Sequence, residues 1–119
     1  MVYPKTYREE AEEADRKFST ILFEIENAVL AFFTEGKTPR LGTLAVALPL
    51  KRKSAEPALS STLLGERSQT ITRILAERLA IIFNKIALVS TFAETIDENS
   101  IGRIFMKLVE RVSKKRGQK

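Results

Sequence analysis

Three short apolar runs follow one another in the first half of the chain, and their patterns are those of β-strands. In residues 18–26 (FSTILFEIE), apolar side chains recur at every second position, which is the period of a half-buried strand. Residues 28–34 (AVLAFFT) and 41–48 (LGTLAVAL) are continuous apolar runs of strand length, bounded by turn-forming residues. We therefore expect a meander of three strands, of which Pro49 limits the third because proline cannot donate to a ladder.

The pattern then changes from a strand period to a helical one. Residues 58–64 (ALSSTLL) are a weaker candidate strand whose serines suit a sheet edge, and Gly65 ends it. A helix is expected to begin at Ser68, a suitable N-cap, and to end at Asn84, which tolerates left-handed geometry. The apolar stripe of this helix, spaced by three and four residues, consists of Ile71, Ile74, Leu75, Leu79, Ile82 and Phe83.

A further strand and a second helix complete the chain. Residues 86–92 (IALVSTF) read as a strand, and capping residues at 97–100 precede a stripe of Ile101, Ile104, Phe105, Leu108 and Val112. The order β-β-β-β-α-β-α predicts an α+β fold, in which a mainly antiparallel sheet of about five or six strands packs against two α-helices. We place this single domain at residues 18–112, between a charged, mobile N-terminal arm (1–17) and a basic C-terminal tail (113–119).

Two of the expected strands are apolar on both of their faces. In residues 28–33 both alternating sets of side chains are apolar, and the same holds for residues 44–48. Because two helices cover only one face of a small sheet, the second face needs another cover. Either the sheet folds back on itself as a sandwich or a second protein supplies the cover, and we favour the second protein.

The parity of the first hairpin gives a candidate interface. If the tight turn lies at Glu26 and Asn27, one face carries Leu22, Val29, Ala31 and Phe33, and the other carries Ile21, Phe23, Ile25, Ala28, Leu30 and Phe32. We assign the partner interface to Leu22, Val29, Ala31 and Phe33. A slip of one residue would exchange the two sets.

The net charge of +5 over 119 residues is confined to one end of the chain. From Lys107 onward there are six cations and one anion, a balance of 6 − 1 = +5, so the preceding residues sum to zero. A nucleic-acid-binding surface normally spreads its cations along a face. We therefore interpret the excess as a solvated helix end. The alternative is a small binding module that contacts nucleic acid or an anionic surface through this tail.

No catalytic, metal or cofactor site is expected. The chain has no cysteine and no histidine, which excludes disulfides, thiolate zinc sites and nucleophiles based on either residue. The run 36–38 (GKT) matches the end of a phosphate-binding loop, but Ala31 stands where the first glycine belongs and no helix should follow. The carboxylates at 9–15 and 97–98 lie in hydrophilic segments without an apolar shell to shift a pKa. The longest uncharged run, 41–50, is too short to span a membrane and the N-terminus is charged, so we expect a soluble intracellular protein.

Four segments, taken in order, resemble one protein family. They are LGTLAVAL (41–48), SSTLLG (60–65), ILAERLA (74–80) and NKIALVS (84–90). Their succession resembles the proteasome assembly chaperone 4 family and, more distantly, the related chaperone 3 family. The most distinctive residues of this motif are Ser61, Thr62, Leu63, Leu64 and Gly65, and Ala76, Arg78, Leu79 and Ala80 match its helix.

The resemblance covers residues 18–112 and carries expectations about function. It implies a non-enzymatic assembly chaperone without a cofactor that forms a heterodimer with a chaperone 3-type subunit. Such a dimer would promote formation of the α-ring of the core (20S) proteasome by holding α-type subunits, the fifth in particular. It also implies a cytoplasmic location with the nucleus as a second compartment, and no membrane or nucleic-acid partner. A self-associating domain that forms a homodimer when the partner is absent is a further alternative, which the sequence leaves open.

Overall fold

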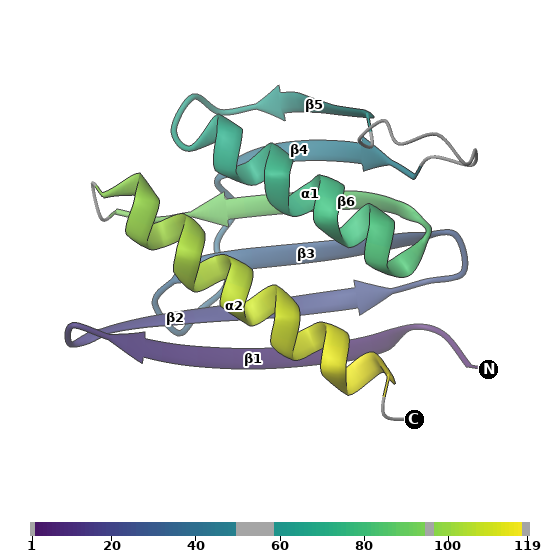
Figure 1. Ribbon diagram of the computed structural model, residues 1–119, viewed down its shortest axis with the longest axis horizontal. Helices are drawn as coiled ribbons and strands as arrows, with labels where there is room; N and C mark the ends of the chain where they lie inside the picture. Colours follow the sequence, from purple (N-terminus) through teal and green to yellow (C-terminus); the bar gives the residue numbers. More distant parts are fainter. Residues whose placement is uncertain (1, 50–58, 95–96, 118–119) are drawn as a thin grey trace.

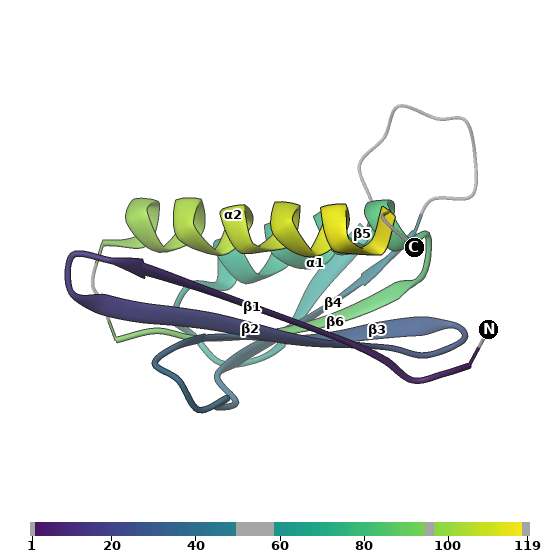
Figure 2. The ribbon, with the colours of Figure 1, turned by 90° about the horizontal axis from the view of Figure 1, so that it is seen from below.

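A six-stranded sheet with two helices on one of its faces forms the fold (Figure 1). The computed structural model describes residues 2–49, 59–94 and 97–117. Its elements in chain order are β1 (Lys5–Glu13), β2 (Arg16–Glu24), β3 (Ala28–Glu35), β4 (Thr43–Leu48), β5 (Leu59–Leu64), α1 (Gln69–Phe83), β6 (Ile86–Phe92) and α2 (Glu98–Gly117). Both helices lie on the same side of the sheet (Figure 2).

The strand order across the sheet is β1-β2-β3-β6-β4-β5. All neighbouring pairs are antiparallel except β3 and β6, which are parallel and form the centre of the sheet. The α+β class is therefore confirmed. The predicted succession of elements is present from β2 onward, with one further strand, β1, before it. Residues 51–57 (KRKSAEP), whose composition predicts a loop, lie outside the described residues.

The structure differs from the predicted mobile N-terminal arm. Residues 5–13 pair with β2 along their whole length, from Lys5 opposite Glu24 to Glu13 opposite Arg16. Ala14 and Asp15, with φ of 53° and 63°, form the two-residue turn between these strands, since such hairpin turns require positive φ at both positions. The sheet therefore begins well before residue 18, where we had placed the start of the domain.

The core lies between the sheet and the two helices. Phe105 of α2 packs against the rings of Phe33 and Phe18, with ring centroids 5.4 and 6.0 Å apart. The face of α1 that is buried consists of Thr72, Leu75, Ala76, Leu79, Ala80 and Phe83. The predicted stripe was partly wrong, because Ile74 is 48% exposed. Small alanine side chains of β4 and β6 lie beneath α1, so the helix approaches the sheet closely. At this short distance the alanines of α1, rather than its isoleucines, face the sheet.

The helix ends match the predictions in part. Asn84 ends α1 in the left-handed conformation, as predicted, with φ of 54°. Ser68 occupies the N-cap position, but its hydroxyl makes no capping hydrogen bond there. At the start of α2, Asp97 accepts hydrogen bonds from the backbone N–H groups of Asn99 (3.1 Å) and Ser100 (3.4 Å). The predicted tail is largely helical, since α2 continues to Gly117, and residues 118–119 lie outside the described part of the chain.

Gly65 occupies a backbone position that only glycine fits. Its φ is +94°, and a Cβ built there would lie 2.7 Å from the Cα of Thr43. We therefore expect Gly65→Ala to lower the free energy of unfolding by more than about 1 kcal/mol, measured by chemical denaturation. Gly117→Ala is the control, because a Cβ at Gly117 meets nothing within 4 Å. An equal, small effect of both changes would contradict the prediction.

Candidate functional site

The face of the sheet opposite the helices carries a continuous set of apolar side chains, which we call the open face. Its rows cross the central strands: Phe23 is opposite Leu30, Leu30 is opposite Leu88, and Leu88 is opposite Val46. The open face consists of Ile21, Phe23, Leu30, Phe32, Leu44, Val46, Leu48, Leu59, Leu64, Ile86, Leu88 and Phe92. In the part of the chain that the structure describes, no helix packs on this side (Figure 2).

The open face is apolar and partly exposed. Toward the edge formed by β5, Leu48, Leu59 and Leu64 are 46%, 67% and 47% exposed, while most of its central residues are half-buried. Single soluble chains seldom expose contiguous apolar patches of more than a few hundred Å². The prediction of two apolar sheet faces, of which the helices cover one, is therefore confirmed. The alternative of a sheet folded back on itself is wrong, because all six strands belong to one sheet.

The four residues that we assigned to the partner interface lie on the other face. Leu22, Val29, Ala31 and Phe33 are each 1% exposed or less and belong to the core beneath the helices. The grouping of these residues on one face was correct, because Leu22 is opposite Ala31, whereas Ile21 and Phe23 are opposite residues of the other face. However, the helices cover the face that carries Leu22 and Ala31. These four side chains therefore cannot contact a second chain, and the partner interface has to be reassigned.

The sequence did contain a signal for the correct face. Residues 44–48 read Leu-Ala-Val-Ala-Leu, so that large and small side chains alternate. The small ones, Ala45 and Ala47, are fully buried next to α1, and the large ones lie on the open face. Small side chains on one face of a strand are typical of a close approach by a helix, so Ala45 and Ala47 mark the helix-covered face. The alternation of side chains along each neighbouring strand then indicates which of its residues lie on that face.

The family motif at residues 61–65 forms the outer edge of the sheet. Ser61 and Leu64 lie on the open face, opposite Val46 and Leu44, whereas Thr62 lies on the helix face opposite Ala45. Leu63 lies at the irregularity in register between Thr62 and Leu64. Leu64 is 47% exposed, and Gly65 makes the close approach to Thr43 described above. The motif thus combines a structural glycine with a strand edge.

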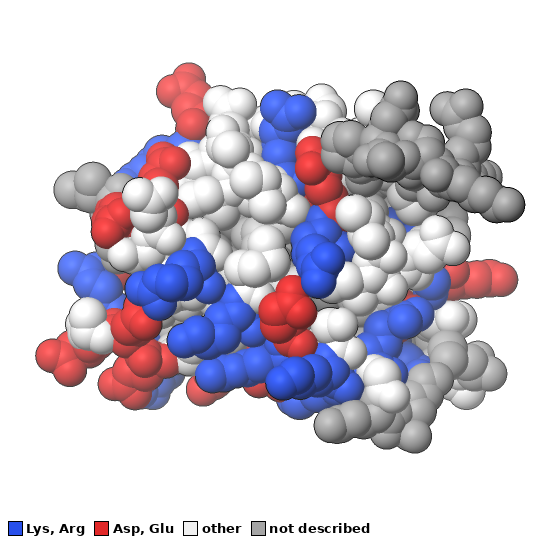
Figure 3. Space-filling view, in the orientation of Figure 1, with Lys and Arg blue, Asp and Glu red and all other residues white. Residues whose placement is uncertain are grey.

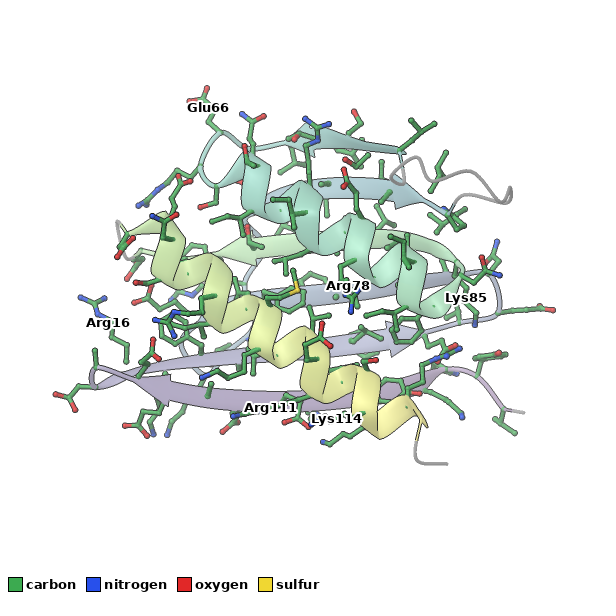
Figure 4. All side chains as sticks on the ribbon, in the orientation of Figure 1. Arg16, Glu66, Arg78, Lys85, Arg111 and Lys114 are labelled. Carbon is green, nitrogen blue, oxygen red and sulfur yellow. The ribbon has the colours of Figure 1, made fainter. Side chains whose placement is uncertain are left out.

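Acidic β1 and basic α2 neutralise each other. Arg103 of α2 forms an ion pair with Glu13 at 2.9 Å, and Lys115 forms one with Glu9 at 2.7 Å. Arg111 donates to the backbone carbonyl of Glu10 at 2.6 Å. Figure 3 shows Lys and Arg side chains gathered over α2, and Figure 4 shows Arg111 and Lys114 on the side of α2 next to β1. Lys115 of the predicted basic tail, and Arg103 and Arg111 before it, are therefore engaged by the chain's own strand, which weakens the case for a polyanion-binding arm.

A buried carboxylate joins four separate segments. Glu24 is 1% exposed, and its carboxylate accepts hydrogen bonds from Lys85 (2.7 Å), Arg116 (3.1 Å) and the Tyr7 hydroxyl (3.3 Å). Burial alone would raise the pKa of Glu24, but the hydrogen bonds from Arg116 and Lys85 outweigh it and lower the pKa below its usual range. Lys85 reaches this carboxylate from the turn between α1 and β6 (Figure 4). The cluster holds the end of α2 on the sheet and is best explained as structural.

The remaining chemical motifs do not form sites. Residues 36–38 lie in the β3–β4 loop, and the helix that a phosphate-binding loop needs does not follow. Among the described residues, no group of three or more Asp or Glu side chains is arranged to hold a metal ion. Within those same residues, no helix has the length and apolar character required to cross a bilayer. The open face is therefore the strongest candidate site.

Comparisons with known proteins bear on the fold and the family of the chain. A comparison with curated protein sequences found no match. The fold is similar to that of a chain in a crystal structure of a chaperone complex for yeast 20S proteasome assembly, with a TM-score of 0.65, 14% identity and 91% of each chain covered. The family model of proteasome assembly chaperone 4 matches residues 17–91, from the start of β2 almost to the end of β6. With the fold and more than half of its sequence in agreement, this chain belongs to the proteasome assembly chaperone 4 family.

Proposed function

We propose that this chain is a non-enzymatic chaperone that promotes formation of the α-ring of the core proteasome, as a heterodimer with a chaperone 3-type subunit. Membership of the assembly chaperone family supports the general role. The single observation that carries the heterodimer is the open face, an apolar surface across five strands that the helices leave uncovered.

The open face has the anatomy of a permanent protein interface. Such interfaces have an apolar core, a polar rim and at least about 800 Å² buried on each partner. Here the core is the apolar row through Leu30 and Leu88. The rim is formed on one side by Arg8 and Glu10 of β1, which are exposed, and at one end by Arg40, whose guanidinium lies 5.2 Å over the Phe92 ring. A second apolar sheet face packed about 10 Å away would bury this core.

The contact with the α-ring is proposed for a different surface. If the open face is covered by the partner subunit, the helix layer stays accessible on the far side of the sheet (Figure 2). That layer is mixed in character, with Arg78 and Glu110 paired at 3.3 Å between the two helices. A transient contact is more polar than an obligate one, and this surface suits binding of α-type subunits, the fifth in particular. The proposed location is the cytoplasm, with the nucleus as a second compartment.

Co-expression tests the proposal. The chain is produced alone, with a chaperone 3-type subunit, and with both that subunit and the fifth α-type subunit, and each sample is analysed by size-exclusion chromatography with light scattering. We expect a 1:1 heterodimer and its co-elution with the α-subunit. A stable monomer that binds neither protein would contradict the proposal.

A further inference from the structure

The two edges of the sheet differ in how they are protected against pairing. Edge strands expose unpaired N–H and C=O groups, and natural proteins protect them with charges or cover. Along β1, six of nine residues are charged (KTYREEAEE). In addition, the carbonyls of Arg8 and Glu10 accept hydrogen bonds from Lys115 (2.8 Å) and Arg111 (2.6 Å) of α2. The β1 edge is therefore closed to a further strand.

The opposite edge has less of this protection. The sequence of β5 is LSSTLL, with no charged residue, and in the described residues no strand pairs with its outer side. One of its carbonyls is engaged, since Arg73 of α1 donates a hydrogen bond to the carbonyl of Ser60 at 3.4 Å, a longer contact than those at the β1 edge. Residues 59–62 pair regularly with β4, and the irregularity in register lies between Thr62 and Leu64. Over residues 59–62 the edge is thus a regular, uncharged template for an added strand, once Arg73 is displaced.

The pattern of β5 indicates what the added strand should look like. Leu59 and Ser61 lie on the open face, opposite Leu48 and Val46, and Ser60 and Thr62 lie on the helix face. An added strand should continue both faces, with apolar or small residues on the first and small polar residues on the second. Residues 59–62 of β5 themselves meet this requirement. Paired antiparallel about a two-fold axis at Ser61, two copies would place Ser60 of one opposite Thr62 of the other and the two Ser61 side chains opposite each other, without any opposed charges.

We propose that β5 pairs antiparallel with β5 of a second copy of this chain and joins the two sheets edge to edge. This edge pairing makes the open face continuous between the two copies and does not cover it. The pairing is therefore independent of which protein binds to the open face. Two six-residue strands bury less than the roughly 800 Å² per partner of a standard interface. The dimer should therefore depend on concentration.

Sedimentation velocity over a concentration series tests the pairing with a matched pair of variants. Ser61→Lys sets two lysines opposite each other at the two-fold axis, and we expect the dissociation constant of the dimer to rise at least about tenfold. Thr6→Lys is the control, since Thr6 is exposed on the same side of the sheet but on the β1 edge, and it should dimerise like the wild type.

Amide hydrogen exchange gives a second, local measurement on the wild-type chain. With rising protein concentration we expect slower exchange in residues 59–64 and no change in residues 5–13. A wild type that stays monomeric throughout the series overturns the proposal, and so does Ser61→Lys with undiminished self-association. Dimerisation that is lost on Phe32→Asp but kept by Ser61→Lys also overturns it, because it would place the contact at the centre of the open face.

Discussion

Replacing Glu24 by alanine is expected to lower the free energy of unfolding by about 3 to 5 kcal/mol. The change removes the carboxylate that Lys85 and Arg116 share and leaves both cations without their partner in a poorly solvated site. Their side chains are only 13% and 32% exposed, so water replaces the lost bonds incompletely. Chemical denaturation of the purified variant measures the loss.

Glu13→Ala is the matched control for this prediction. Glu13 also pairs with an arginine of α2, Arg103, but the two side chains are 37% and 56% exposed. Exposed ion pairs contribute little to stability because water screens them, so this change should have a much smaller effect. Equal losses in the two variants would show that burial of Glu24 does not decide its contribution.

The same carboxylate makes stability depend on pH in a defined direction. The pKa of Glu24 is lowered in the folded chain, so its contribution is fully present above the unfolded value of about 4.3. The contribution is lost as the pH falls from there through the folded pKa. The free energy of unfolding of the wild type should therefore decrease more steeply than that of Glu24→Gln when denaturation is followed from pH 6 down to pH 3. Parallel curves would contradict the assignment.

Phe32→Asp is expected to weaken binding of the chaperone 3-type partner at least about 100-fold while leaving the chain folded. Phe32 lies on the open face opposite Ile21 and Ser90, is half-buried in the single chain, and would become buried under the proposed partner. A carboxylate there can keep its water in the monomer but loses it in the complex. Titration calorimetry measures the affinity, and circular dichroism checks the fold.

Phe33→Asp, at the neighbouring residue, provides the contrast. Phe33 is 1% exposed and packs against Phe105 in the core, so a carboxylate there should prevent folding. Two adjacent phenylalanines thus separate binding from folding. A folded Phe33→Asp variant, or a Phe32→Asp variant that binds normally, would show that the two faces are assigned incorrectly.

Strands with a clear apolar pattern and short connections could be predicted from the sequence, but β1 could not. Its only apolar contacts with the core come from Tyr7 and Ala11, between charged residues. Its ladder partner, β2, is adjacent in sequence, but the side chains that hold it against the helix layer are distant: Glu9 pairs with Lys115, and the carbonyl of Glu10 accepts a hydrogen bond from Arg111. A local pattern contains no information about partners that lie about a hundred residues away.

For the candidate site, parity alone sorted residues into faces but could not say which face the helices cover. Both sets in β3 are apolar, so hydrophobicity gave no preference between Phe32 and Phe33. The decision comes from side-chain size on a different strand, where Ala45 and Ala47 let α1 approach the sheet. The same alanines explain why α1 turns its isoleucine at position 74 toward solvent.

The position of β6 between β3 and β4 has a consequence for protein synthesis. The β1–β2–β3 meander and the β4–β5 hairpin are each local in sequence, but they share no hydrogen bonds with each other. A nascent chain that has left the ribosome only as far as α1 therefore holds two half-sheets with bare inner edges. Insertion of β6 seals both edges in one event, and until then the growing chain is most exposed to aggregation.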